Sequence, residues 1–187
     1  MDCGDVANYR PISLTCVLSK VLQRIIANKI FDHLQSNNIL NKSQHGCTRR
    51  RSTYTNMLEC VNDWTICLQS QHQVAVVYID FRKAFDIVSH KKLFLKLHLY
   101  GIHGALLLWI QNFFTGRTHH TRLGSSVSDI AQLTSGVVQG SGIGRPLMFL
   151  IYVNELIDIL EQYGVKVKVF ADDAKMYLRI TDDEDVA

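Results

Sequence analysis

Apolar residues recur with a helical period in several parts of the chain. Between Ser13 and Gln35 they lie three or four positions apart, which predicts a long amphipathic helix after Pro11. The same spacing predicts a second helix from Met57 to Leu68. Further helical patterns cover His90 to Tyr100, Ala105 to Phe114 and Leu147 to Leu160. The last of these follows Pro146, which is suited to a first helical turn.

Other segments have the pattern of strands. Val74 to Ile79 is a continuous apolar run, which predicts a strand covered on both faces and ending at Asp80. The stretch from Thr118 to Val138 contains short runs separated by Gly and Ser, which predicts short strands joined by turns.

The segments Val165 to Phe170 and Lys175 to Ile180 predict a hairpin with Asp172 and Asp173 at its tip. If opposing residue numbers add up to 345, one face is wholly apolar, and Val169 lies opposite Met176. The other face is polar apart from Phe170. This register also places Lys166 opposite Arg179, a like-charge contact that the register does not explain.

Length and composition indicate a globular domain. The chain has 187 residues, of which 47% are hydrophobic, so disorder is excluded. A domain of this size buries about 70% of its unfolded surface. No apolar run approaches the ~18 residues that a membrane-spanning helix needs, and residues 1–10 lack a secretory signal. We therefore expect an intracellular protein without a membrane partner.

Basic residues are concentrated in the first two thirds of the chain. Up to Arg122 there are 15 basic and 7 acidic residues, whereas from Leu123 onward there are 5 and 10. The first two thirds are therefore suited to face a polyanion.

Three aspartates stand at predicted strand ends. Asp80 ends a strand, and Asp172 and Asp173 form the hairpin tip. Carboxylates brought together repel one another, and Mg²⁺ allows all of them to ionise. Two such ions about 3.5–4 Å apart stabilise the attacking and leaving oxygens of a phosphoryl displacement. An aspartate pair is also common in tight turns, so spacing alone leaves a catalytic and a structural interpretation open.

Five strings in the chain add a second signal. They are Asn8-Tyr-Arg-Pro-Ile-Ser-Leu14, Gln44-His-Gly-Cys-Thr-Arg-Arg-Arg-Ser-Thr53, Tyr78-Ile-Asp-Phe-Arg-Lys-Ala-Phe-Asp86, Gly136-Val-Val-Gln-Gly-Ser141 and Phe170-Ala-Asp-Asp173. In this order they resemble the motifs of reverse transcriptases, particularly those of non-LTR (LINE-type, jockey-like) retrotransposons. The resemblance covers the chain from about Asn8 to Ile180.

The resemblance implies an α+β fold made of right-hand polymerase fingers and palm, with an antiparallel palm sheet packed on helices. Residues 1–187 would form a single reverse transcriptase domain fragment, with 1–73 mainly fingers and 74–187 mainly palm. The chain ends soon after the aspartate hairpin, so we expect the thumb to be absent and the chain alone to be inactive. An endonuclease and a thumb are expected in the intact protein.

The resemblance also assigns a metal site. Asp80, Asp172 and Asp173 would be the catalytic residues and would hold two Mg²⁺ ions, or Mn²⁺ in their place. The backbone carbonyl of Phe81, beside the nucleotide, would be an extra ligand.

Nucleotide-binding residues follow in the same way. Phe85 would close the pocket beneath the incoming sugar and favour dNTP over rNTP, and the alternative without the resemblance is an ordinary core residue. Gln139 and Gly140 would lie beside the nucleotide, the amide as a hydrogen-bonding group and the glycine as a point of close backbone approach. Arg49 and Arg51 would clamp the triphosphate or a template phosphate, or lie on a solvated surface.

The chain departs from the family pattern at three places. Cys47 stands where the family usually has Phe, and Arg82 where it often has Ser. Arg145 intervenes between Gly144 and Pro146. One inserted residue would rotate the following helix by about 100°, unless a loop absorbs it, because an α-helix has 3.6 residues per turn.

These observations predict an RNA-directed DNA polymerase of a retrotransposon, with an RNA template, a DNA primer and dNTP as partners and the nucleus as the location of the intact protein. A first rival is an inactive mobile-element remnant that at most binds nucleic acid, which Arg145 and the missing thumb favour. A second rival is an RNA-synthesising polymerase or a nucleotide cyclase, against which Phe85 argues.

Overall fold

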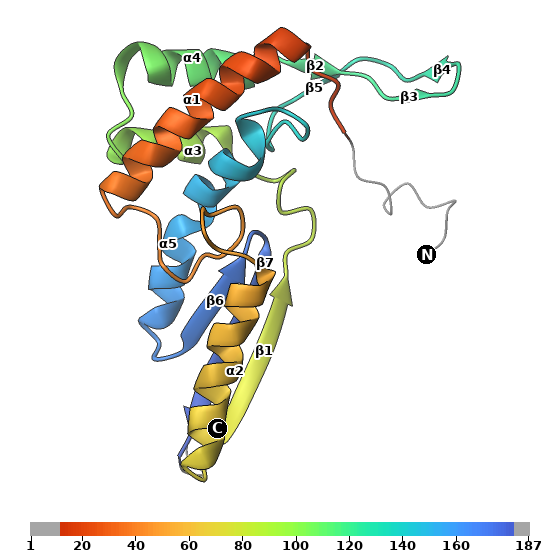
Figure 1. Ribbon diagram of the computed structural model, residues 1–187. Coiled ribbons are helices and arrows are strands. Elements are labelled where there is room, and N and C mark those ends of the chain that lie inside the picture. The colour runs from red at the N-terminus through yellow and green to blue at the C-terminus, as the bar shows by residue number, and fades with distance from the viewer. Residues whose placement is uncertain (1–11, 182–187) are drawn as a thin grey trace. The chain divides into compact units, whose positions relative to one another are not determined.

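The computed structural model describes residues 12–181, apart from the side chains of Arg145 and Pro146. The chain forms two compact units, each built from two stretches of sequence (Figure 1). The helical unit comprises residues 1–33 and 85–148, and the sheet unit comprises residues 34–84 and 149–187. The beginning of the Asn8–Leu14 string lies outside the described residues. No helix within residues 12–181 has the length and apolar character needed to cross a membrane.

The helical unit contains most of α1 (Val17–Ser36) together with α3 (His90–Leu99) and α4 (Gly104–Phe114). These bounds confirm the helices predicted from the apolar period. Its core includes four fully buried side chains from α3 and α4, namely Leu93, Leu97, Ile110 and Phe114. His33 of α1 contacts the carbonyl oxygen of Tyr100, just after α3, through Nε2 at 2.8 Å.

Four two-residue strands extend from this unit as a narrow antiparallel ribbon (Figure 1). β2 (Thr118–His119) pairs with β5 (Ala131–Gln132), and β3 (Arg122–Leu123) pairs with β4 (Ser126–Val127). All eight residues are exposed. The short strands predicted from the Gly and Ser spacing are therefore confirmed.

A π-helical turn, η2 (Gly144–Met148), precedes α5 (Phe149–Glu161). The backbone N–H of Met148 donates to the carbonyl oxygen of Ile143, five residues back, at 3.4 Å. A turn closed by such a bond contains one residue more than an α-helical turn. The extra residue expected at Arg145 is thus accommodated by a widened turn at the start of the helix.

The sheet unit is a three-stranded antiparallel sheet between two helices. The strand order is β1-β7-β6, with β1 (Gln73–Asp80), β7 (Asp173–Ile180) and β6 (Lys166–Phe170). On one face, Ile157 of α5 packs against Val167, Val169 and Ala174. This apolar layer is the core of the unit.

Helix α2 (Thr53–Gln69) covers the opposite, polar face of the sheet. Its side chains bind four residues of β6 and β7. Lys168 Nζ lies 2.6 Å from Glu59 Oε2, Lys166 Nζ lies 3.0 Å from Asp63 Oδ2, Lys175 Nζ lies 2.9 Å from Asn56 Oδ1, and the Tyr177 hydroxyl lies 2.7 Å from Asp63 Oδ2. The lysines that the sequence placed on one face are therefore paired with the helix above them.

The register predicted for the hairpin is wrong by two residues. Val169 lies opposite Ala174 and Phe170 opposite Asp173, which leaves only Ala171 and Asp172 in the turn. Because side chains alternate between faces, a shift of two keeps each residue on its predicted face. Lys166 lies opposite Tyr177 rather than Arg179, so the like-charge contact of the predicted register disappears.

The prediction that the strand from Val74 to Ile79 is covered on both faces is also wrong. β1 is an edge strand with β7 as its only strand neighbour in the described sheet. Its Val77 is 52% exposed. A continuous apolar run is typical of a buried strand, but here part of it is left at the sheet edge.

The hydrogen bond between Tyr177 and Asp63 should contribute measurably to stability. Burial tends to raise the pKa of Asp63, but the hydrogen bonds from Tyr177 and Lys166 outweigh it and hold this pKa below its usual value. We expect Tyr177→Phe to lower the free energy of unfolding by about 1.5 kcal/mol. The cost should persist down to about pH 4 and fade only at lower pH, where Asp63 becomes protonated.

Chemical denaturation of the two proteins measures this cost. Tyr163, whose side chain is 80% exposed, is the matched control, and Tyr163→Phe should change the free energy of unfolding by less than about 0.5 kcal/mol. Equal costs for the two substitutions would contradict the stabilising role of the Tyr177 hydroxyl.

Candidate active site

The sheet brings the predicted aspartates together at one end. Asp80, the last residue of β1, lies directly opposite Asp173, the first residue of β7. Directly opposed residues of an antiparallel pair have Cα atoms about 4.5–5.5 Å apart and side chains on the same face. Asp172 precedes Asp173 and completes the two-residue turn. This register brings Asp80 beside the hairpin turn.

Two of the three aspartates at this end of the sheet, Asp80 and Asp172, have no counter-charge among the described residues. Like charges directly opposite each other in a sheet are destabilising. The side chains of Asp80 and Asp172 form no hydrogen bond or ion pair with any residue between 12 and 181. Lys175, the next residue on the Asp173 face of β7, donates to Asn56 instead. The arrangement therefore suits a cation supplied from outside the chain.

The donor set fits a hard cation that a substrate helps to hold. Within the described residues, no three His, Cys, Asp or Glu side chains converge into a metal cage. Mg²⁺ usually binds through one or two carboxylates together with substrate phosphates and water, rather than in a cage made only of protein. Asp80 and Asp173 provide such a pair of carboxylates, with Asp172 next to them. The three-aspartate metal site stays a prediction.

The carbonyl of Phe81, predicted as an extra ligand, accepts a hydrogen bond from the Ala84 N–H at 3.2 Å. A carbonyl oxygen has two lone pairs, so it retains one for a further partner.

Of the predicted arginines, Arg51 is held by two neighbours in the sheet unit. Its guanidinium lies 2.7 Å from His45 Nε2 and 3.6 Å from Glu59 Oε1. Its side chain remains 27% exposed. A guanidinium has five N–H donors. Arg51 is therefore held in one orientation and still has N–H donors for a further partner. Arg49 is exposed on the preceding loop.

His45, which sequence reasoning did not single out, is buried and neutral. Burial is the largest cause that lowers the pKa of His45, and the charge of Arg51 lowers this pKa further. Glu59 acts in the opposite direction but does not reverse the shift. Because Arg51 can only donate, His45 Nε2 accepts and Nδ1–H donates to Thr55 Oγ1 at 2.9 Å.

Gln44, its neighbour, was also missed and is only 3% exposed. The signal in the sequence was that both residues lie in the Gln44–Thr53 string, whereas their burial is seen only in the structure.

The remaining predicted residues belong to the helical unit. The loop from Gly136 to Gln139 is hydrogen-bonded to the segment from Phe85 to Val88. The N–H groups of Gly136 and Val137 donate to the carbonyls of Val88 and Phe85, each at 2.8 Å. Gln139 Nε2 donates to Asp86 Oδ1 at 2.9 Å. The Gln139 amide therefore has a fixed orientation within its own unit, and Phe85 is 6% exposed.

The structure explains why position 140 is a glycine. Its φ of +91° lies in the region that favours glycine, and a Cβ there would lie 2.7 Å from the carbonyl oxygen of Ser13. The Ser13 N–H also donates to the carbonyl of Gln139 at 2.8 Å. The close backbone approach predicted for a nucleotide is thus made here by Ser13, and the nucleotide role stays a prediction.

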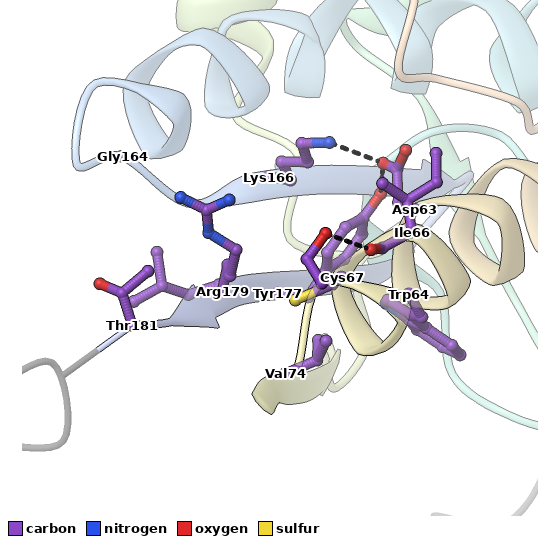
Figure 2. A pocket seen from close by; sticks show the side chains of 12 residues that line it. Asp63, Trp64, Ile66, Cys67, Val74, Gly164, Lys166, Tyr177, Arg179 and Thr181 are labelled. Carbon is purple, nitrogen blue, oxygen red and sulfur yellow. Dashed lines mark hydrogen bonds and ion pairs between the residues drawn. The ribbon is translucent and has the colours of Figure 1, made fainter. Parts of the chain in front are cut away.

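A hollow of about 430 Å³ lies at the other end of the hairpin from the aspartates. Figure 2 shows Asp63, Cys67 and Tyr177 around it, with Lys166 and Arg179 at its rim. None of its lining residues was predicted as a site residue. Two of its lining residues, Lys166 and Tyr177, bind a third, Asp63, through the interactions already described.

Comparison with known proteins finds one family model and several similar proteins. A family model described as "Reverse transcriptase (RNA-dependent DNA polymerase)" matches residues 4–185. The probable RNA-directed DNA polymerase from transposon X-element of Drosophila melanogaster is 29% identical over 97% of this chain and 20% of its own length. The RNA-directed DNA polymerase from mobile element jockey of the same species is 26% identical over 90% of this chain and 19% of its own.

A Pol polyprotein from the type-1 retrotransposable element R2 of Popillia japonica is 28% identical over 99% of this chain and 26% of its own length. The chain thus spans about a fifth to a quarter of the curated relatives it matches.

The buried His45 should make stability depend on pH. Because its folded-state pKa is lowered, the stability that neutral His45 contributes is complete above about pH 6.5. It is lost as the pH falls through the lower folded-state pKa, since the unfolded chain binds the proton more readily. We expect the free energy of unfolding to fall between pH 7.5 and 5, and to fall less steeply in His45→Gln.

Denaturant titrations at several pH values measure this slope. His119, an exposed residue of β2, is the matched control, and His119→Gln should keep the wild-type slope. If His45→Gln and His119→Gln have the same slope, another group is responsible for the pH dependence.

Proposed function

We propose that this chain, which belongs to the reverse transcriptase (RNA-dependent DNA polymerase) family, supplies the catalytic carboxylates of a retrotransposon RNA-directed DNA polymerase. The observation that carries the proposal is the pairing of Asp80 with Asp173 at the end of the sheet where Asp172 forms the turn. The substrates would be an RNA template, a DNA primer and dNTP. Two divalent cations, Mg²⁺ or Mn²⁺, would supply charge neutralisation at the attacking and leaving oxygens when bound.

The aspartates would act through their fixed position. Asp80, Asp172 and Asp173 present carboxylate oxygens at one end of the sheet, where a primer 3′-hydroxyl would attack the α-phosphate and pyrophosphate would leave. The sheet register keeps Asp80 and Asp173 in place, so little reorganisation is needed when charge develops in the transition state.

Arg51 and Arg49 would bind phosphate oxygens. Arg51 is suited to this because His45 and Glu59 already orient its guanidinium, which lowers the entropic cost of engaging a phosphate. Phe85 would close the pocket beneath the sugar, and Gln139 and Gly140 would border the nucleotide. Phe81 would add its carbonyl oxygen.

We propose the fingers and palm arrangement for this domain, with residues 1–73 mainly fingers and 74–187 mainly palm. A thumb, an endonuclease and a nuclear location are proposed for the intact protein. The rival interpretation, an inactive remnant, rested partly on Arg145. The widened turn at Gly144–Met148 weakens that reason, because it accommodates one extra residue at the start of α5.

Primer extension tests the polymerase proposal. The chain in its full-length protein context should extend a DNA primer on an RNA template, with dNTP preferred over rNTP. We expect Asp172→Asn and Asp80→Asn each to lower kcat by about 100-fold or more, because each removes a charge that the transition state depends on. Asp129→Asn, at an exposed loop carboxylate, is the matched control and should leave the rate unchanged.

Equal rates for wild type and Asp172→Asn would overturn the assignment. A preference for rNTP would instead indicate an RNA-synthesising polymerase. Binding to nucleic acid that is indifferent to Asp172→Asn and weakens steeply with salt, without extension, would indicate a remnant.

A further inference from the structure

We propose that Gln44 is a positioning residue that holds the aspartate turn, Phe170–Asp173, through the backbone of Ala171. This inference rests on the proposed function, because it assigns Gln44 to the placement of Asp172 and Asp173. Gln44 would touch no substrate, and its effect on catalysis would pass entirely through the turn.

The aspartate turn has a conformation that needs support. Only Ala171 and Asp172 connect the paired residues Phe170 and Asp173. Ala171 has a φ of +58°, in the left-handed region where the Cβ of an L-residue is crowded by its own backbone. Glycine would adopt this conformation freely, but the chain has alanine there. The turn is therefore strained at the residue next to Asp172.

Gln44 binds this strained residue directly. Its Oε1 accepts hydrogen bonds from the N–H of Ala171 at 3.0 Å and from the N–H of Gly46 at 2.7 Å. Two N–H donors converge on one atom, so that atom must be the amide oxygen and not the amide nitrogen. Because the Gln44 side chain is buried, water competes little for these bonds.

The segment Ser43–Gly46 is itself fixed to the sheet. Val169 donates to the Ser43 carbonyl at 2.9 Å and accepts from the His45 N–H at 2.8 Å, so the segment forms a parallel bridge beside β6. A Cβ on Gly46 would overlap the backbone nitrogen of Ala171, which means that the two backbones are in direct contact. Gln44 is thus anchored on one side and bound to the turn on the other.

The amide nitrogen of Gln44 shows that packing alone does not explain a glutamine at this position. Gln44 Nε2 is buried and has no hydrogen-bond partner within the described chain. An unsatisfied buried donor is destabilising and calls for an explanation. An apolar side chain of the same length would avoid it, so packing alone does not account for this residue. The acceptor at Oε1 does account for it.

Loss of this acceptor should loosen the turn that carries Asp172 and leads into Asp173. Catalytic groups must be held close to their productive geometry, and small misplacements cost large factors in rate. The consequence would be a lower rate and a weaker response to the metal, without a change in the affinity of a nucleotide that Gln44 does not touch.

Hydrogen exchange tests the clamp without requiring activity. In the 187-residue chain, we expect Gln44→Met to speed amide exchange in peptides spanning the aspartate turn by about five- to tenfold, in line with the loss of the buried hydrogen bond that the Ala171 N–H donates. Gln69→Met, the same change at an exposed position of α2, is the matched control and should leave this exchange unchanged. Unchanged exchange in Gln44→Met overturns the inference.

A second variant keeps the test decisive if Gln44→Met does not fold. Ala171→Gly relieves the left-handed strain, so combining it with Gln44→Met should restore folding and return exchange towards the level of Ala171→Gly alone. If the turn in the double variant exchanges as fast as in Gln44→Met alone, Gln44 does not offset the strain at Ala171. That result overturns the inference.

Primer extension by the full-length protein then distinguishes a positioning role of Gln44 from a role in fold stability alone. We expect Gln44→Met to lower kcat about tenfold and to raise the Mg²⁺ concentration for half-maximal rate, with KM for dNTP unchanged. A rise in KM alone would overturn the positioning role. If the wild type extends no primer, the proposed function fails, and the exchange comparison still tests the clamp independently.

Discussion

Strand β1 pairs with β7 so that Asp80 lies opposite Asp173, and this register is set by the apolar face one residue away. Ile79, next to Asp80, lies opposite Ala174 and packs against the core under α5. A slip of one residue would expose Ile79 and turn Asp80 towards that core, where an unpaired carboxylate is very costly. Burial of apolar side chains therefore holds two like charges side by side.

The remaining charges of the sheet unit leave Asp80 and Asp172 without a counter-charge among the described residues. The lysines of the polar face are bound by α2, through Glu59, Asp63 and Asn56. Asp80 and Asp172 have no such partner among residues 12–181. The separation of paired and unpaired charges on one small sheet is what a cation-dependent site requires.

The sequence predicted the elements well, because helices and strands are set by local periodicity. It also predicted which face of the hairpin each side chain occupies, because side chains alternate between the two faces along a strand. It missed the register, because a slip of two residues leaves the alternation of Val167, Val169 and Met176 unchanged. The apolar run of β1 looks the same for a central strand and for an edge strand.

Roles that depend on distant partners were out of reach of the sequence. The amide of Gln139 binds Asp86, and the space beside Gly140 is taken by Ser13, more than 100 positions away. Neither partner is marked by spacing or composition. The aspartates were predictable because their positions follow from strand ends, which local patterns do mark.

Positive and negative charges of the candidate site depend on the same short segment. Through Gln44 Oε1, the segment Ser43–Gly46 holds the turn that carries Asp172. Through the ring of His45, it orients Arg51, which also lies near Glu59. His45 can do this only while it is neutral, and burial together with Arg51 keeps its pKa low. Because both side chains are fixed by the backbone bonds of this segment to Val169, a displacement there would move the carboxylates and the guanidinium together. The geometry between the Arg51 guanidinium and the acidic turn is therefore a property of one four-residue segment, and it would survive changes elsewhere in the loop that leave this segment paired with β6.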